Sequence, residues 1–488
     1  MQLDQLLSVL TPLQIMGSTD KDITGIVFDS RLVEPGNLFV AQCGTVADGH
    51  QYINSCIARG AAAIVCERTE GIDAGEATII QVTDSNEALG LLAGCWYGFP
   101  SRQLTLVGVT GTNGKTTIAT LLYQLTRQMG QKAGLLSTVV NYVDTEAVPS
   151  THTTPDSLTI NRLLRQMVDK GCRYAFMEVS SHALAQSRVA GLDFDGALFT
   201  NLTRDHLDYH KTFDNYRDTK KLLFDHLKKE AFAVTNKDDK NGPVMVQNCA
   251  ARVYTYSTRA LADYRGSILE EGLDGMLLNV NGKEVMVRLV GRFNLQNLLC
   301  IYGAAVSMGF DKDEVLRILS VLQPVNGRFE TIHSPKGWTA VVDYAHTPDA
   351  VDNVIRTINE ILETQTRKTG QKPRLITVVG CGGNRDKGKR PQMAQIAMQG
   401  SDQLILTSDN PRNEDPKAIL QDMAAGLSED QLRRTLIIED RAAAIQTACT
   451  LATNGDVILI AGKGHEDYQI IQGVKHHFDD HEEVKKYI

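Results

Sequence analysis

A glycine-rich segment that ends in Lys-Thr-Thr, residues 110–117, carries the strongest chemical signal in this sequence. An apolar, β-branched run (104–109) precedes it and a helical pattern follows to about Met129, which predicts a strand, a loop and a helix. The N–H groups of such a loop bind phosphate oxygens at the N-terminus of the helix. Lys115 supplies a positive charge for the β- and γ-phosphates, and the hydroxyl of Thr116 or Thr117 suits Mg²⁺.

The segment departs from the usual phosphate-loop pattern G-x-x-x-x-G-K-[ST]. That pattern requires glycine at position 109, where this chain has Val109, with Gly108 and Gly111 on either side. The departure weakens a general NTPase assignment. A chance match is nevertheless disfavoured, because strand, loop, Lys-Thr-Thr and helix follow in the required order.

Other candidate ligands follow later strands. Glu178 ends an apolar run and is followed by Val-Ser-Ser-His, at the strand end where ligands collect in open α/β sheets. Oxygen and imidazole ligands suit Mg²⁺ held together with phosphates, and Thr116, Glu178 and His206 fit that description. Taken singly, His206 is more typical of a hydrogen-bonded core histidine than of a metal ligand, and Lys220 with its neighbour Lys221 is typical of a solvated helix face.

The length of 488 residues predicts several domains, and strand-like and helix-like stretches alternate throughout. Gly98-Phe99-Pro100-Ser101 and the segment 323–328 interrupt this alternation. We therefore expect three α/β domains: residues 1–99, residues 100–330 with a central P-loop-type doubly wound parallel sheet, and residues 331–488 with a Rossmann-like sheet. The polar, basic stretch 364–373 is expected to be a solvated connection.

The composition excludes several classes of protein. A net charge of −8, with no basic run interleaved with aromatics, disfavours nucleic acid as a partner. No apolar run has the length of a membrane span and no basic leader begins the chain, so we expect a cytoplasmic protein. The nine cysteines are scattered without a C-x-x-C pair, which favours reduced, buried thiols over disulfides or a zinc site.

Six segments together make a family resemblance visible. They are residues 110–117, Glu-Val-Ser-Ser-His at 178–182, Thr-Asn-Leu-Thr-Arg-Asp-His-Leu-Asp at 200–208, Gly-Arg-Phe-Glu at 327–330, Asp-Tyr-Ala-His-Thr-Pro at 343–348 and Gly-Lys-Gly-His-Glu at 462–466. In this order they resemble the motifs of the Mur ligase family, and the first also resembles the loop of folylpolyglutamate synthetases. The resemblance covers nearly the whole chain and implies an ATP- and Mg²⁺-dependent ligase that forms an amide bond through an acyl phosphate.

The resemblance also implies roles for individual residues. Lys115, His206 and Lys220 are implied to be catalytic, with Lys220 as a carbamoylated lysine, and the metal ligands are implied to be Thr116, Glu178, His206 and Lys220. The implied ATP contacts are Gly111, Thr112, Asn113, Gly114, Lys115, Thr116, Thr117, Asn294, Asn297, Arg328 and Asp343. The two asparagines could instead be helix caps. Arg328 lies near a domain junction, so we expect it to reach the nucleotide only after the third domain closes.

Two further sets bear on the substrates. Ser30, in Asp29-Ser30-Arg31, resembles the uridine-binding position of the family members that add the third peptide residue. Thr153, Thr154, Ser180, Gln186 and Arg188 match positions that hold the muramoyl dipeptide. The implied acceptor is UDP-N-acetylmuramoyl-L-alanyl-D-glutamate, and hydroxyls with an arginine suit its carboxylate and phosphate oxygens.

The stretch Asp-Asn-Pro-Arg-Asn-Glu at 409–414 resembles the motif of members that add meso-diaminopimelate. The implied contacts are Arg385, Asp409, Asn410, Pro411, Arg412, Gly462 and Glu466. Arg412 with Arg385 can take the second carboxylate of this amino acid, which lysine lacks, and Glu466 its ammonium. As a structural motif alone the stretch is a polar turn.

Three alternatives stay open: a lysine-adding Mur ligase, a folylpolyglutamate synthetase, and a nucleotide-binding regulatory protein without ligase activity. Arg412 argues against the first and the uridine-type N-terminal segment against the second. The presence of Lys115, Glu178, His206 and Lys220 disfavours the third. We expect the protein to act as a monomer.

Overall fold

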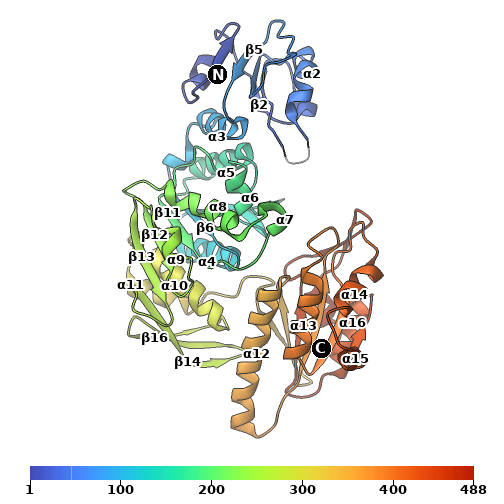
Figure 1. Cartoon of the computed structure of the whole chain (residues 1–488). Helices are drawn as coiled ribbons and strands as arrows, with labels where there is room; N and C mark the ends of the chain where they lie inside the picture. The colour runs from blue at the N-terminus through green and yellow to red at the C-terminus, as the bar shows by residue number, and fades with distance from the viewer. Residues whose placement is uncertain (45–46, 151) are drawn as a thin grey trace.

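The computed structural model describes residues 1–44, 47–150 and 152–488, and the chain forms three α/β domains along its length (Figure 1). Three sheets of five, eleven and six strands form from β1–β5, β6–β16 and β17–β22, in that order. The second sheet begins at Thr105 and the third at Glu330. The three-domain α/β fold is therefore confirmed, while the boundaries at residues 99 and 330 stay predictions.

The first domain is a small sheet in the order β1-β5-β4-β3-β2, in which only β1 is antiparallel to its neighbour. Its last helix starts where the Asp84 carboxylate accepts from the N–H groups of Asn86 and Glu87, and it packs on α5 of the central domain (Figure 1). The elements are α1 (Leu3–Leu7), β1 (Gln14–Met16), β2 (Gly25–Val27), η1 (Ser30–Leu32), β3 (Asn37–Val40), η2 (Gly49–Tyr52), α2 (Ile53–Ala58), β4 (Ala63–Cys66), β5 (Thr78–Gln81) and α3 (Ser85–Trp96).

The central domain has the sheet order β16-β15-β14-β13-β12-β11-β6-β10-β7-β8-β9. Its elements begin with η3 (Pro100–Arg102), β6 (Thr105–Thr110), α4 (Lys115–Gln128), β7 (Ala133–Leu136), β8 (Val140–Val143), β9 (Glu146–Pro149), α5 (Ser157–Asp169), β10 (Tyr174–Glu178), α6 (Ser181–Ala185), β11 (Gly196–Phe199), α7 (Leu207–His210) and α8 (Phe213–Asp225). They continue with β12 (Phe232–Asn236), α9 (Gly242–Met245), β13 (Arg252–Ser257), β14 (Tyr264–Gly272), β15 (Gly275–Val280), β16 (Lys283–Val287), α10 (Arg292–Ser307) and α11 (Lys312–Leu319).

The expected parallel pairing is confirmed for the middle of the sheet, in the order β14-β13-β12-β11-β6-β10-β7. The sheet as a whole is mixed. Both edges end in antiparallel hairpins, β7-β8-β9 on one side and β14-β15-β16 on the other. The turn between β15 and β16 is Asn281-Gly282, with φ of 49° and 87°. This Asn-Gly pair is the preferred two-residue hairpin turn, and it explains the change to antiparallel pairing.

The third domain has the order β17-β18-β22-β19-β20-β21, parallel except for β17, with a separate hairpin β23-β24. Its elements are β17 (Glu330–His333), β18 (Thr339–Asp343), α12 (Pro348–Thr369), β19 (Leu375–Cys381), α13 (Lys389–Gly400), β20 (Gln403–Ser408), α14 (Pro416–Ala424), α15 (Glu429–Arg433), β21 (Thr435–Ile437), α16 (Arg441–Leu451), β22 (Val457–Ala461), β23 (Tyr468–Ile471), β24 (Val474–His477) and α17 (Asp480–Lys485).

The expectation that residues 364–373 form a loop is wrong for its first part. The helix α12 runs to Thr369 and ends at Gly370, whose φ of 74° is the left-handed conformation that glycine adopts easily. The hydroxyls of Thr366 and Thr369 donate to carbonyls four residues earlier, Leu362 and Gln365, and lie along the helix instead of breaking it.

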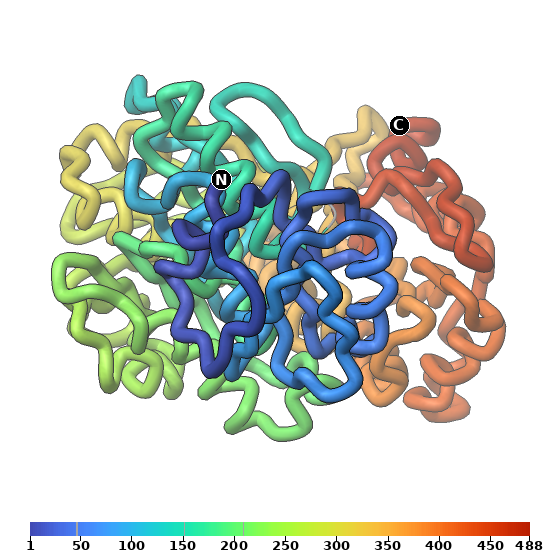
Figure 2. Tube along the Cα trace, turned by 90° about the horizontal axis from the view of Figure 1, so that it is seen from above, coloured from blue at the N-terminus to red at the C-terminus, as the bar shows by residue number. Residues whose placement is uncertain are grey.

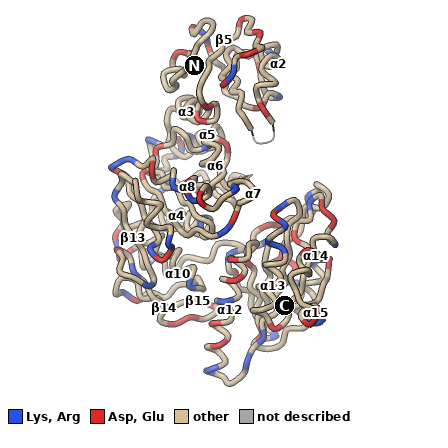
Figure 3. Tube along the Cα trace, in the orientation of Figure 1, with Lys and Arg blue, Asp and Glu red and all other residues tan. Residues whose placement is uncertain are grey.

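The views in Figures 1 and 2 place the first domain at one end of the molecule and the third beside the central domain. Figure 3 shows Lys and Arg interspersed with Asp and Glu along all three domains. Within the described ranges, no helix combines the length and apolar composition that crossing a bilayer requires.

Candidate active site

A cleft of about 1050 Å³ separates the central and third domains and is lined by residues of both. On the central side, β6 and β10 end at it, with Thr112 and Glu178 in its wall. On the other side β18, β20 and β22 end at it, with Asp343, Asp409 and Gly462. The carboxyl ends of two parallel sheets thus face one another, which is where α/β folds bind ligands.

The phosphate loop is fixed by two glycines in the left-handed half of φ space. Gly111 (φ 145°) and Gly114 (φ 88°) allow close packing, since an added Cβ would lie 1.9 Å from Thr200 Oγ1 and 2.5 Å from Asn297 Oδ1, respectively. Lys115 Nζ donates to the carbonyls of Gly111 and Thr112 at 3.0 and 2.9 Å. Burial lowers the pKa of Lys115, although the carboxylates of Glu178 and Asp205 oppose the shift.

Glu178 is 1% exposed and lines the cleft. Its Oε2 accepts from Thr116 Oγ1 at 2.9 Å, and its Oε1 accepts from the N–H and hydroxyl of Thr138 at 2.7 and 3.0 Å. These partners hold the carboxylate beside the phosphate loop.

Lys220 lies behind the loop and does not line the cleft, as far as the described residues define it. It is 1% exposed, Lys221 is 8% exposed, and the solvated-face interpretation is therefore wrong. Lys220 Nζ donates to the carbonyl of Gly111 at 2.8 Å and lies 4.8 Å from the ring centroid of Tyr216. Burial, reinforced by the charge of Lys115, lowers its pKa well below the usual value.

His206 lines the same cleft at the start of α7, with φ of 52°. Its Nε2 lies 3.3 Å from Asp205 Oδ2, and its ring centroid is 4.8 Å from that of His182. Desolvation lowers the pKa of His206 to about 4, although the negative charge of Asp205 opposes the shift. The ring is consequently neutral near pH 7, the form that ligates metals.

The remaining residues expected at the nucleotide meet at the domain junction. Asn294 and Asn297 lie inside α10, where Asn297 Nδ2 donates to Asn294 Oδ1 at 3.1 Å; the cap for this helix is Gly291, so the helix-cap alternative is wrong. Arg328 Nη2 donates to Thr116 Oγ1 at 3.3 Å, so this arginine contacts the loop in the arrangement described here. Asp343 is buried and accepts from the N–H groups of residues 329 and 345, both at 2.7 Å.

The residues expected at the dipeptide form one hydrogen-bonded group. Thr154 Oγ1 donates to the carbonyl of Glu178 at 2.8 Å and accepts from the N–H of Ser180 at 3.0 Å. Arg188 donates to the Thr154 carbonyl at 2.8 Å and to Gln186 Oε1 at 2.6 Å. Thr153 joins the group through Thr138 Oγ1 at 3.1 Å. All but Gln186 line the cleft.

The residues expected at the amino acid lie across the cleft from the phosphate loop. Asn410 Nδ2 donates to Glu466 Oε2 at 2.7 Å, and Asp409 Oδ1 is buried without a hydrogen-bond partner among the described residues. Burial and the charge of Asp409 raise the pKa of Glu466. Arg412 (φ 55°) donates from Nη1 to the Gly383 carbonyl at 2.8 Å. Arg385 and Gly462 also line the cleft, whereas Pro411 does not.

Several residues that sequence reasoning missed belong to the cleft or support it. Asp349 is one of them: its Oδ2 accepts from Asn113 Nδ2 at 2.9 Å, which joins the phosphate loop to the first turn of α12. His346 lines the cleft, and burial lowers its pKa to about 4. Lys463 is fully buried, 3.2 Å from Glu466 Oε2. The signal for Lys463 was present, because it stands within the Gly-Lys-Gly-His-Glu motif.

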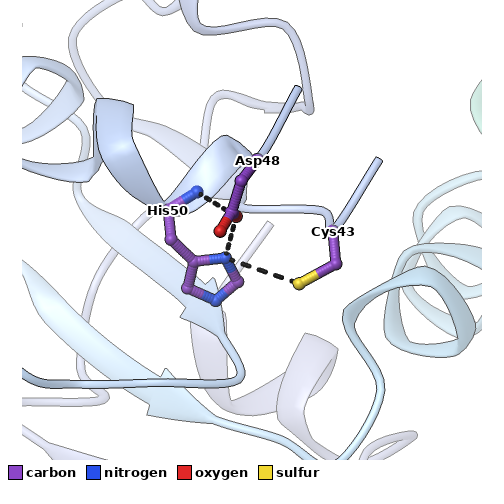
Figure 4. A group of neighbouring side chains, drawn as sticks. All are labelled: Cys43, Asp48 and His50. Atoms are coloured by element: carbon purple, nitrogen blue, oxygen red, sulfur yellow. Dashed lines mark hydrogen bonds and ion pairs between the residues drawn. The ribbon is translucent and has the colours of Figure 1, made fainter. Parts of the chain in front are cut away.

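The first domain contributes no residue to the cleft among those described, so Ser30, in η1, lies apart from the other predicted positions. Cys43, Asp48 and His50 gather in that domain, with ligand atoms within 4.8 Å of one another (Figure 4). His50 Nε2 accepts from the N–H of Glu67 at 2.9 Å, so Nδ1 carries the proton that reaches Asp48 Oδ1 at 2.8 Å. These bonds use both ring nitrogens of His50.

The cleft and fold define a class of protein: an ATP-dependent ligase of three α/β domains, with a phosphate loop facing a third domain. The Mur ligase middle domain matches residues 109–305, the Mur ligase glutamate ligase domain residues 327–464, and the Mur ligase family catalytic domain residues 22–97. This chain belongs to the Mur ligase family.

Relatives match over the full length. A protein of Parabacteroides distasonis named UDP-N-acetylmuramoyl-L-alanyl-D-glutamate--2,6-diaminopimelate ligase is 60% identical and covers 100% of this chain and 99% of its own. A protein of the same name from Phocaeicola vulgatus is 56% identical over 99% of both. A solved structure with this name is 34% identical, with a TM-score of 0.68 over 99% of this chain and 98% of that one.

Proposed function

We propose that this protein joins meso-2,6-diaminopimelate to the γ-carboxylate of the D-glutamate in UDP-N-acetylmuramoyl-L-alanyl-D-glutamate, a step of peptidoglycan biosynthesis. One observation carries the proposal: a single cleft has the phosphate loop on one wall and the polar edge of Asp409, Arg412 and Glu466 on the other. The relatives that bear the corresponding name support the choice of substrates.

The reaction needs an activated carboxylate. A carboxylate oxygen of the acceptor attacks the γ-phosphorus of ATP, ADP leaves, and an acyl phosphate forms; the amine then attacks the acyl carbon, loses a proton and displaces phosphate. Lys115, the loop N–H groups and Arg328 would neutralise the charge on the transferred phosphoryl group. Positioning and charge account for most of the catalysis of such a transfer.

The donor set around Glu178 fits a divalent cation. Glu178 and Thr116 offer oxygens 2.9 Å apart, and His206 offers a neutral ring from the same cleft. Mg²⁺ held by these three residues would neutralise phosphate charge. Burial lowers the pKa of Lys220 and so favours the neutral amine, the form that reacts with CO₂; we propose that Lys220 is carbamoylated and acts as an anion behind the loop.

The acceptor would extend from the cleft towards the first domain. Thr153, Thr154, Ser180 and Arg188 offer hydroxyl groups and a guanidinium for the dipeptide, and Gln186 orients the guanidinium. Ser30 would contact the uridine nucleotide.

The incoming amino acid would bind with its distal head at Arg412. The two hydrogen bonds that this guanidinium makes to described residues both leave Nη1, so Nη2 and Nε remain for a carboxylate. Glu466 and Asp409 suit the ammonium. Lysine, the closest alternative, would leave the guanidinium unpaired, which favours diaminopimelate.

Phosphate release with UDP-N-acetylmuramoyl-L-alanyl-D-glutamate, ATP and Mg²⁺ tests the proposal, with meso-diaminopimelate and L-lysine in parallel. Release with diaminopimelate and mass-spectrometric detection of the tripeptide product would support it. Preference for lysine would support the ligase activity but refute diaminopimelate as the substrate. ATP turnover independent of amine and acceptor would favour a regulatory protein. The cytoplasmic location and monomeric state stay predictions.

A further inference from the structure

A buried ion pair lies directly behind the amino-acid side of the cleft. Arg441 begins α16 and Asp480 begins α17, and both side chains are 0% exposed. The pair is bidentate, because Nε donates to Oδ1 and Nη2 to Oδ2, both at 2.7 Å. A charged pair without water contact needs its remaining donors satisfied as well.

The same guanidinium meets those needs at the ends of two strands. Nη2 donates to the carbonyl of Ala461 at 3.1 Å and Nη1 to that of Ser408 at 3.4 Å, and these are the last residues of β22 and β20. The next residues in the chain are Gly462 and Asp409, and both line the cleft. One side chain therefore ties together the two points where the amino-acid loops begin.

The contact of Arg441 with both strands matters because β22 and β20 are not hydrogen-bonded neighbours. In the sheet order β17-β18-β22-β19-β20-β21, β19 lies between β22 and β20. Ladder hydrogen bonds stop at the strand ends, so they do not set the distance between the two loops beyond that point. Arg441 bridges this distance with the rigid fork of its guanidinium, a geometry that lysine does not reproduce.

Stability alone does not account for this arrangement. A buried ion pair gains little over apolar side chains of equal volume, because the cost of removing both charges from water offsets their attraction. Asp409 Oδ1, one residue beyond the tied carbonyl, is buried and accepts no hydrogen bond from the described residues, with Lys463 Nζ 3.8 Å away, so it keeps acceptor capacity for a ligand.

We propose that Arg441, held by Asp480, is a positioning residue that fixes the separation of the loops starting at Asp409 and Gly462 and so sets the affinity for the incoming amino acid. This inference rests on the proposed function for the identity of that amino acid. It assigns the C-terminal helix α17 a part in substrate binding, although no residue of that helix lines the cleft within the described ranges.

The test is the double substitution Arg441→Met/Asp480→Leu, which removes both charges at nearly constant volume. We expect thermal unfolding within a few degrees of the parent, a KM for diaminopimelate raised about tenfold, and KM values for ATP and the acceptor within about twofold. Arg374→Met is the matched control, because Arg374 pairs with Asp456 at 2.7 Å at the opposite ends of β19 and β22. It should leave every KM unchanged.

An unchanged KM for diaminopimelate in the folded double variant would overturn the inference. If that variant fails to fold, Arg441→Lys replaces it, and the same KM comparison decides. Hydrogen exchange of the amides of residues 409, 410, 412 and 462–466 separates this inference from the proposed function. Faster exchange in the variant supports the tie even if the parent uses another amino acid, and unchanged exchange refutes it. A parent that releases no phosphate with any amine refutes the proposed function alone.

Discussion

The replacement Arg412→Ala tests which amino acid this enzyme adds. The guanidinium keeps Nη2 and Nε available while Nη1 is bonded to the Gly383 carbonyl. A bidentate contact with a carboxylate would supply two charge-assisted hydrogen bonds of about 1.5–3 kcal/mol each. Because water can hydrogen-bond to the carboxylate in the variant, we expect the binding free energy of diaminopimelate to weaken by about 3 kcal/mol, which is roughly a 100-fold rise in its KM.

The fold should survive this change. The backbone of residue 412 is held by its own bonds, with its N–H donating to the Ile470 carbonyl at 2.9 Å, and these remain in the variant. Its φ of 55° is unfavourable for arginine and alanine alike, so the substitution adds no strain. The unfolding free energy should therefore change by less than about 1 kcal/mol.

The assay is steady-state phosphate release, with diaminopimelate, ATP and acceptor each varied in turn. Arg412→Lys keeps the charge without the fork and should raise the KM about tenfold, and Arg433→Ala, on the exposed end of α15, serves as the control. A KM for diaminopimelate within twofold of the parent in Arg412→Ala would refute the assignment of the distal carboxylate. A uniform fall in kcat would instead indicate a damaged fold.

Three further outcomes are expected. Glu178→Gln should raise the Mg²⁺ concentration for half-maximal activity at least tenfold, and an unchanged Mg²⁺ titration contradicts the metal site. The unfolding free energy should change by less than about 1 kcal/mol, because the loss of charged hydrogen bonds is offset by the removal of a buried charge. Lys220→Gln should lower kcat about 100-fold with the KM for ATP little changed, and full activity would exclude carbamoylation as a requirement. The pKa of His346 is lowered to about 4 in the folded protein, so the unfolded chain binds the proton first as pH falls below about 6.5 and stability is lost. In urea unfolding, His346→Gln should therefore lose less stability than the parent between pH 7.5 and pH 5, and equal losses would refute this origin.

The parallel strands and the phosphate loop were predictable because their signals are local. The apolar run 104–109 forms β6 over Thr105–Thr110, and the helix predicted to follow it to about Met129 is α4, Lys115–Gln128. Fully buried strands give continuous apolar runs that stand out from helical periodicity. Gly111 and Gly114 then mark where the backbone must turn towards the ligand.

The errors concern segments whose structure depends on neighbours. The hairpin at Asn281-Gly282 had a recognisable turn pair, but its strands alternate buried residues with half-buried or exposed ones, and their apolar runs at 276–278 and 285–287 are only three residues long. The end of α12 had no apolar periodicity at all, because its last turns extend past the buried Ile361 and Leu362 into solvent. Such a helix continues until a residue such as Gly370 ends it.

The site residues divide along the same line. Lys220 and Lys221 are adjacent and chemically identical in sequence, and only their packing distinguishes them: Lys220 Nζ reaches the Gly111 carbonyl, whereas Lys221 pairs with Asp225. Motif resemblance selected the lysine whose amine contacts the loop; periodicity could not distinguish the two. Neither a motif nor periodicity marks Arg441. Its partner Asp480 is 39 positions away, and the carbonyls it binds are backbone groups that any residue has. A residue that acts through backbone atoms leaves no trace in the spacing of side chains, so positioning groups of this kind become visible only once the fold has brought the strand ends together.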